Sequence, residues 1–186
     1  MNTVLIAAML AMAAVVAASN VLVMLPINDW MTWGSLSYPM TYLVTDLANR
    51  HQGATAARRV VYVGFVVGAP LSIWLASPRL AAASLSAFLL SQLLDVWLFS
   101  RLRRRLQRWW QPPLASPLLA SIPDTVLFFA IAFAGSPLPW MQWALGDYAI
   151  KVMMGITLLG PFRILAGQAS LSSAGPTRHV LSSRSP

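Results

Sequence analysis

Long apolar stretches, separated by short segments rich in proline, glycine and arginine, run through most of the chain. A helix needs ~20 apolar residues to cross the ~30 Å hydrocarbon core of a bilayer. The chain divides into six stretches of about this length, and we predict transmembrane helices at residues 3–25, 30–49, 60–76, 80–100, 115–134 and 143–166. The pattern therefore predicts an all-α, polytopic integral membrane protein with six transmembrane helices in one bundle.

The second predicted helix is more polar than the others, because it contains Pro39, three threonines and Asp46. Its ends still resemble membrane interfaces, with Trp30 and Trp33 at one end and Arg50 at the other. We therefore predict that this segment also spans the bilayer.

Serine, arginine and proline dominate the chain after residue 166. Such a segment has too little apolar surface to pack against the rest of the protein. We predict two regions, a transmembrane domain at residues 1–166 and a disordered cytoplasmic tail at residues 167–186.

The arginines outside the apolar stretches fall almost entirely on one side of the predicted bundle. With the N-terminus inside, the inward loops and the tail carry ten of them, whereas Arg79 is the single arginine of the outward loops. Cytoplasmic loops of membrane proteins carry an excess of Lys and Arg, so we predict that both termini are cytoplasmic. The net charge of +8 is explained by these clusters, and we predict the lipid bilayer, not nucleic acid, as the partner.

Composition removes several kinds of chemistry. Only 10% of the residues are charged, against ~25% in soluble domains, which excludes an ordinary soluble globule. The chain has no Cys and no Glu, and its two histidines, His51 and His179, lie far apart, so we predict no metal site and no cofactor. No GxxxxGKS or GxxxxGKT loop is present for nucleotide hydrolysis. We predict that the protein is not an enzyme and has no catalytic residues, although an aspartic dyad in a membrane enzyme stays open.

Four charged residues lie inside predicted spans: Asp46, Asp95, Asp124 and Lys151. A charge at the centre of a membrane helix costs ~2.5–3.5 kcal/mol even on the lenient insertion scale, so these side chains should face the interior of the bundle. They could hold helices together, or they could line a polar cavity that binds a solute. Three acids against one base leave a charge that a sealed core tolerates poorly, which favours the cavity.

Spacing extends this candidate site. Polar residues recur every three or four positions along residues 38–49 and again along residues 91–95, so each set shares one helix face. Asn20, near the end of the first helix, is either a cavity ligand or an interhelical hydrogen-bond partner. Asp147, four residues before Lys151, is expected to form a local ion pair. Our candidate substrate-binding residues are Asn20, Tyr38, Thr41, Tyr42, Thr45, Asp46, Asn49, Gln92, Asp95, Asp124 and Lys151.

Two sets of small residues suggest close helix packing. Ala7, Ala11, Ala14 and Ala18 recur on one face of the first helix, and Gly64 and Gly68 form a small-xxx-small pair on the third. We predict internal packing for both, with a docking face for a partner as the alternative for the alanines.

Several ordered motifs resemble one family. Residues 38–49 read YPMTYLVTDLAN, which resembles the YPxTxLVTDxxN signature of the queuosine precursor transporters, in the vitamin uptake transporter group. Residues 91–96, SQLLDV, resemble the SQxxD motif of that family. Asp124 followed by Thr125 resembles the acid of its fifth helix, and Lys151 resembles a position of its last helix. Arg50 stands where the family usually has Glu.

The resemblance implies an inner-membrane transporter that imports a 7-deazaguanine, such as 7-cyano-7-deazaguanine, its aminomethyl form or queuine. A guanine-like edge offers two N–H donors to a carboxylate and a carbonyl acceptor to an amide or ammonium, and aromatic rings can stack on it. The alternative is the substrate-binding membrane subunit of a multi-component vitamin importer. The sequence leaves open the energy source, the exact 7-deazaguanine and a homo-oligomer.

Overall fold

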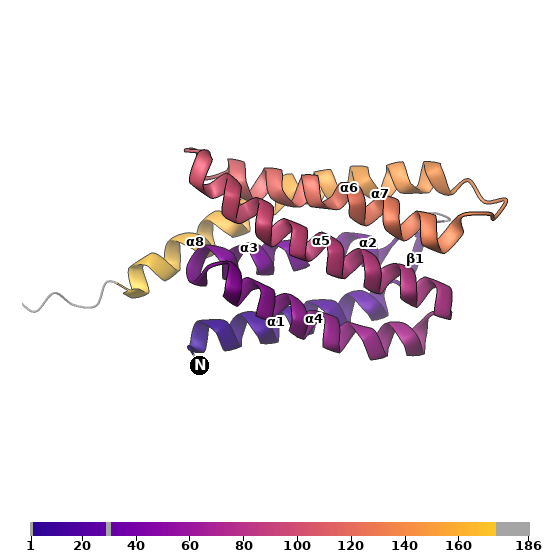
Figure 1. Ribbon diagram of the computed structural model, residues 1–186, viewed down its shortest axis with the longest axis horizontal. Coiled ribbons are helices and arrows are strands. Elements are labelled where there is room, and N and C mark those ends of the chain that lie inside the picture. The colour runs from indigo at the N-terminus through magenta and orange to yellow at the C-terminus, as the bar shows by residue number, and fades with distance from the viewer. Residues whose placement is uncertain (1, 29–30, 174–186) are drawn as a thin grey trace, which may run out of the picture.

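The computed structural model describes residues 2–28 and 31–173 and is a bundle of helices with one small hairpin (Figure 1). The all-α class is confirmed. The helices are α1 (Thr3–Leu22), α2 (Trp33–Ser37), α3 (Met40–Gln52), α4 (Ala54–Leu75), α5 (Pro78–Arg105), α6 (Gln111–Phe133), α7 (Trp140–Thr157) and α8 (Leu159–Ser173). Strands β1 (Pro26–Asn28) and β2 (Met31–Thr32) pair antiparallel between α1 and α2.

Five segments of the described chain are long and apolar enough to cross a membrane: α1, α4, α5, α6 and the stretch Trp140–Gly167, which contains α7 and most of α8. Leucine, valine and tryptophan side chains point outward around them, including Trp74 at 81% exposure and Leu145 at 72%. Such a surface is unfavourable in water and is expected where lipid surrounds the bundle. The protein is a polytopic membrane protein.

The predicted second span is not one helix. The structure divides residues 33–52 into α2 and α3 on either side of Tyr38 and Pro39, and its predicted start at Trp30 lies outside the described residues. Pro39 has no N–H to continue the hydrogen-bond ladder of α2, which explains the break. In Figure 1, α2 lies near the hairpin and α3 lies toward the end where α1 begins. The two short helices together return the chain along the bundle, in place of the single helix that the sequence predicted.

The other predicted spans correspond to observed helices with shifted ends. Strand β1 follows the predicted first span, and β2 lies at the start of the predicted second span. Helix α4 begins at Ala54, and α5 continues through Arg105 into the basic run. Helix α8 continues to Ser173, beyond the predicted start of the tail at residue 167. Residues 174–186 of that tail lie outside the described part of the chain.

Small residues allow α1 and α4 to approach closely. A Cβ atom on Gly64 would lie 2.8 Å from Cγ of Met12, and one on Gly68 would lie 2.9 Å from Cγ1 of Val16. The packing role predicted for the two glycines is confirmed. The alanine prediction was wrong, because Ala7, Ala11, Ala14 and Ala18 are all exposed on the outer side of α1. Spacing places residues on one face of a helix but does not say which face meets the bundle.

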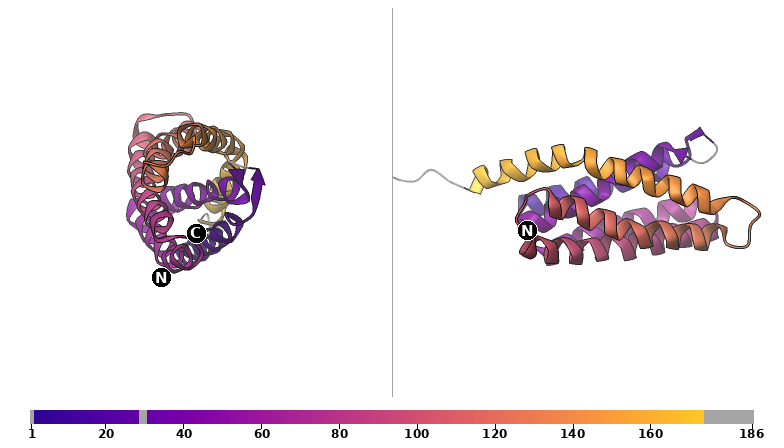
Figure 2. Two further views of the ribbon diagram at one scale, coloured as in Figure 1. Left: turned by 90° about the vertical axis from the view of Figure 1, so that its right-hand side faces the viewer. Right: turned by 90° about the horizontal axis from the view of Figure 1, so that it is seen from above.

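The helices run side by side along the long axis of the molecule (Figure 2), and the described chain begins and ends at the same end of the bundle (Figure 1). We call this the arginine-rich end, because Arg50, Arg58 and Arg103 lie at the termini of α3, α4 and α5 there. Arg79 starts α5 at the opposite end, which we call the hairpin end, and donates hydrogen bonds of 2.6 Å to the carbonyls of Ile131 and Ala134.

Candidate solute-binding site

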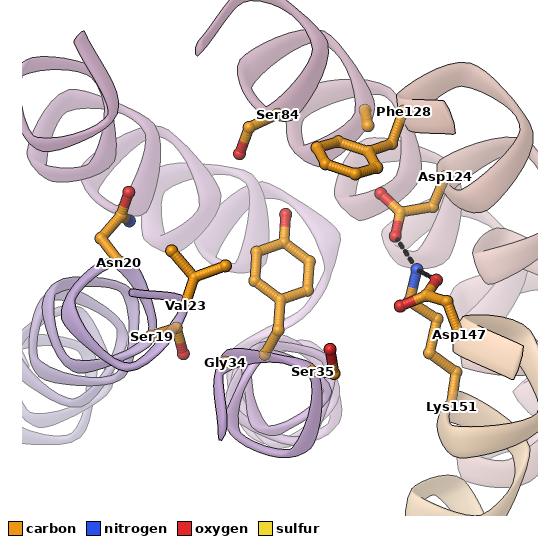
Figure 3. A pocket seen from close by; sticks show the side chains of 12 residues that line it. Ser19, Asn20, Val23, Gly34, Ser35, Ser84, Asp124, Phe128, Asp147 and Lys151 are labelled. Atoms are coloured by element: carbon orange, nitrogen blue, oxygen red, sulfur yellow. Dashed lines mark hydrogen bonds and ion pairs between the residues drawn. The ribbon is translucent and has the colours of Figure 1, made fainter. Parts of the chain in front are cut away.

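The bundle contains a cavity of about 140 Å³, which we call the larger cavity (Figure 3). A single water needs only ~10–15 Å³, so the space can hold a small solute. Five helices, α1, α2, α5, α6 and α7, contribute to its walls. The lining residues lie in the half of the bundle near the hairpin. The residues around it are Ser19, Asn20, Val23, Gly34, Ser35, Tyr38, Ser84, Ala87, Asp124, Phe128, Asp147 and Lys151.

A charged cluster forms one wall of the larger cavity. Nζ of Lys151 lies 2.7 Å from Oδ2 of Asp124 and 2.6 Å from Oδ2 of Asp147. Thr125 accepts a 2.9 Å hydrogen bond from Lys151 and donates one of 2.9 Å to Asp147. Ser91 donates a 2.9 Å bond to Oδ1 of Asp124. One ammonium and two carboxylates leave a net charge of about −1 on this wall when both acids are ionised.

The two carboxylates of this cluster differ in how they are engaged. Both oxygens of Asp124 accept hydrogen bonds, and its side chain is only 3% exposed. Asp147 is 18% exposed, and its recorded partners among the described residues all contact Oδ2. Oδ1 of Asp147 is therefore the carboxylate oxygen of the cluster that is free to accept a hydrogen bond from a solute.

Aromatic and amide groups complete the walls. Figure 3 shows the ring of Phe128 pointing into the larger cavity beside Asp124, with Asn20 on the opposite side. Tyr38 also borders the cavity, and its ring packs edge to face on Phe88 with centroids 6.0 Å apart. Asn20 borders the cavity and accepts a 2.8 Å hydrogen bond from Ser72 of α4. The interhelical hydrogen bond expected as one of its two roles is confirmed, and its role as a solute ligand stays a prediction.

The structure separates the predicted site residues into groups. Asn20, Tyr38, Asp124 and Lys151 border the larger cavity. Tyr42 and Asp46 border a second, smaller cavity of about 20 Å³, and Lys151 borders that one as well. Asp95 is buried beside Asp46 on the neighbouring helix. Thr41, Thr45, Asn49 and Gln92 lie at the contact between α3 and α5.

The polar groups at the contact between α3 and α5 are hydrogen-bonded to one another or to the backbone. Thr45 donates to Oε1 of Gln92 at 2.6 Å, and Nε2 of Gln92 donates to Oγ1 of Thr41 at 2.8 Å. Nδ2 of Asn49 donates to the carbonyl of Val96 at 2.9 Å. These bonds hold α3 against α5, as the structural interpretation of buried polar residues expects. A role of these residues in substrate binding stays a prediction.

Several cavity residues were not among those predicted, notably Ser19, Ser35, Ser84 and Asp147. The predicted ion pair between Asp147 and Lys151 is confirmed, but its spacing gave no indication of a cavity beside it. The serines lie among small or apolar neighbours without a repeating pattern, so no sequence signal distinguished them.

Membrane-length apolar helices around a charged interior cavity define a polytopic membrane protein with a candidate solute site. Residues 32–76 and 71–166 match the family model described as "Putative vitamin uptake transporter". The chain belongs to this family, which confirms the resemblance inferred from its motifs.

Curated relatives agree. The chain is 37% identical over 175 residues to "Queuosine precursor transporter" of Escherichia coli (strain K12), covering 79% of each protein. It is 34% identical over 187 residues to "Probable queuosine precursor transporter" of Haemophilus influenzae, again covering 79% of each. A protein of the same name from Bacillus subtilis is 28% identical over 69% of this chain and 68% of the relative. No solved structure matches the chain.

Proposed function

We propose that the protein imports a queuosine precursor of the 7-deazaguanine class across the bacterial inner membrane, and that it binds this solute in the larger cavity. The observation that carries the proposal is the cluster of Lys151, Asp124 and Asp147 on the cavity wall. A buried cluster with an excess acid is unfavourable in a membrane bundle unless it serves a polar ligand. The names of the curated relatives support the substrate class.

The cavity walls suit a guanine-like ring. The free Oδ1 of Asp147 can accept an N–H of the pyrimidine edge. The ammonium of Lys151 can donate to the carbonyl of the ring by giving up its hydrogen bond to the hydroxyl of Thr125. Phe128 and Tyr38 offer ring faces for stacking, while Asn20 lies across the cavity to meet a polar substituent at position 7. The solute leaves chemically unchanged, so we propose transport without catalysis.

We propose that both termini are cytoplasmic. The arginine-rich end of the bundle holds the start of α1 and the end of α8, and arginine marks cytoplasmic ends. The larger cavity then lies in the outer half of the membrane, where it would receive solute from the periplasm.

Uptake into cells that cannot synthesise 7-deazaguanines tests the proposal. Cells expressing the chain should accumulate one or more of the cyano, aminomethyl and queuine forms, detected by mass and unaltered in structure. Uptake equal to that of cells without the chain contradicts the proposal, and a chemically converted solute would indicate a membrane enzyme.

A second candidate function is the substrate-binding subunit of a multi-component importer. The exposed alanine face of α1, formed by Ala7, Ala11, Ala14 and Ala18, favours this possibility because small residues let another helix approach closely. Vesicles that contain only this chain separate the two functions. Uptake by the chain alone supports the single-chain transporter, and binding without uptake supports the subunit.

A further inference from the structure

A second group of acids lies outside the larger cavity. Asp46 of α3 is 1% exposed and Asp95 of α5 is 0% exposed. The two acids are neighbours at the contact between these helices, where Thr45 bonds to Gln92 and Asn49 bonds to the carbonyl of Val96. The buried hydroxyl of Ser116 from α6 lies beside them. Within the described chain, Oδ1 of Asp46, both carboxyl oxygens of Asp95 and Oγ of Ser116 are buried without a hydrogen-bond partner. Buried polar atoms are rarely left unsatisfied, so this group needs an explanation.

Among the described residues, no cation forms an ion pair with either acid. The described ion pairs are those of Lys151 with Asp124 and Asp147. Tyr42, on the same helix as Asp46, has a buried hydroxyl that also makes no hydrogen bond among the described residues. Helix α1 has no titratable side chain. The arginines of the other packed helices contact other groups or solvent. Arg58 and Arg59 of α4 are exposed. Arg103 of α5 donates to the carbonyls of Asn49 and Arg50, and Arg163 of α8 lies over the ring of Trp109.

Two ionised carboxylates in contact repel each other, and burial away from water makes the repulsion stronger. A single proton between them removes one charge and supplies the missing donor, so that one carboxyl group hydrogen-bonds to the other. The contact between Asp46 and Asp95 is therefore favourable only with a proton bound.

The smaller cavity links this pair to the solute site. Its volume of about 20 Å³ exceeds the ~10–15 Å³ that one water needs, and both Asp46 and Lys151 border it. Lys151 also borders the larger cavity. With the proton bound, the pair carries one negative charge against two on Asp124 and Asp147, and the ammonium stays with Asp124 and Asp147. Once the proton leaves, an additional negative charge at Asp46 attracts the ammonium across the smaller cavity, which weakens the solute site.

We propose that Asp46 and Asp95 share one proton, and that binding and release of this proton couple solute transport to the proton gradient. The proton binds at the carboxyl pair when solute is taken up from outside and leaves from the same pair to cytoplasmic water when solute is released. The coupling rests on the proposed transport function, whereas the shared proton does not.

Infrared spectroscopy of the purified full-length chain at neutral pH tests the shared proton without any solute. We expect the carbonyl stretch of a protonated carboxylic acid, shifted in D₂O, and we expect Asp46→Asn and Asp95→Asn each to remove it. Asp147→Asn is the matched control, because an ion-paired carboxylate contributes no such band. Ser116→Ala keeps both acids and should shift the frequency of the band, which provides a test if an Asn variant does not fold. A parent protein without the band, or a band that persists in both Asn variants, overturns the proposal.

Proteoliposomes test the coupling, with 7-aminomethyl-7-deazaguanine as the probe and the membrane potential clamped at zero. One proton per solute allows ~tenfold accumulation for a gradient of one pH unit. We expect the parent to approach this value and to carry protons inward with the solute, and Asp46→Asn or Asp95→Asn to lose the response to the gradient.

Transport that ignores the proton gradient or follows a sodium gradient contradicts the coupling but not the proposed function. A parent that neither binds nor moves any 7-deazaguanine contradicts the proposed function, and the infrared band still decides the shared proton.

Discussion

The proposed solute site depends on the ammonium of Lys151, because two carboxylates and one hydroxyl from two helices converge on it. Asp124 is fully engaged by Lys151 and Ser91, whereas Asp147 keeps one oxygen free at the cavity. The two acids should therefore respond differently to the same substitution, although both belong to one cluster.

Asp147→Asn is expected to reduce 7-deazaguanine affinity while the fold persists, because Asp124 still pairs with Lys151. A hydrogen bond to a charged group contributes ~1.5–3 kcal/mol, and ~1.4 kcal/mol is a tenfold change in affinity, so binding should weaken by roughly ten- to a hundredfold. Titration of the purified variant and its thermal unfolding measure the two effects. Affinity equal to that of the parent would exclude Asp147 as a ligand.

Asp124→Asn is the matched comparison and should lower stability as well as binding. It removes the more deeply buried partner of Lys151. Because Asp147 still pairs with the ammonium, the cost should stay below the ~3–5 kcal/mol of a buried charge that has lost its partner. The same unfolding and titration measurements apply. If Asp124→Asn melts like the parent, the cluster contributes less to folding than its geometry indicates.

Residue-level predictability was uneven for a physical reason. Asp124 and Lys151 could be identified because a charge inside an apolar stretch is costly and stands out in the sequence. Asp147 stood out only as an i,i+4 partner, and Ser84 or Ser35 did not stand out at all. Burying a small polar side chain costs little free energy, so a serine in the sequence does not indicate a cavity until the positions of the helices are known.

At the level of the elements, the break between α2 and α3 sets the shape of the solute site. Helix α2 packs so closely on the end of α1 that a Cβ atom on Gly34 would lie 2.8 Å from Cα of Val23. Both residues border the larger cavity, as do Ser35 and Tyr38 in and after α2. The sequence contained the cause of the break in Pro39, but hydropathy averaged over the segment hid it.

Gly34→Ala should displace α2, because backbone atoms of Val23 cannot move aside as a flexible side chain can. We expect ~1–3 kcal/mol of destabilisation from the overpacking, together with weaker solute binding. Gly160→Ala in α8 is the control, since a Cβ atom there meets nothing within 4 Å and Ala favours a helix. Unfolding midpoints and titrations compare the two. An unchanged Gly34→Ala would show that α2 is not held in place by this contact.

Gln92→Ala tests the contact between α3 and α5. It leaves the buried hydroxyl of Thr45 without its acceptor, whereas the hydroxyl of Thr41 still donates to the carbonyl of Tyr38. An unsatisfied buried group costs ~1–3 kcal/mol. Chemical unfolding should therefore shift to lower denaturant, whereas Ser86→Ala, at an exposed position of the same helix, should stay within ~0.5 kcal/mol of the parent. Equal stability of the two variants would contradict a structural role for Gln92.

For the whole molecule, the sequence predicted the passes along the bundle better than it predicted which helix surfaces meet a neighbour. Apolar length and arginine placement predicted the passes along the bundle, and five of them are membrane-length segments in the described chain. The exposed alanine face of α1 could not be predicted, because helix spacing does not reveal which face meets a neighbour.

The absence of Cys from the chain allows a direct test of its orientation. A single Cys at Leu138, which is 44% exposed at the hairpin end, should react with an impermeant thiol reagent in intact cells. A single Cys at Ser172, at the arginine-rich end, should be protected until the membrane is opened. The reverse labelling pattern would invert the topology and place the larger cavity toward the cytoplasm.

Uptake of 7-deazaguanines into vesicles that contain only this chain is the measurement that tests the central claim most directly. The account predicts that the parent fills the vesicles with at least one 7-deazaguanine, that empty vesicles do not, and that Asp147→Asn slows filling about tenfold or more at low solute. Uptake no faster than leakage into empty vesicles, or equal uptake by the parent and Asp147→Asn, would contradict it.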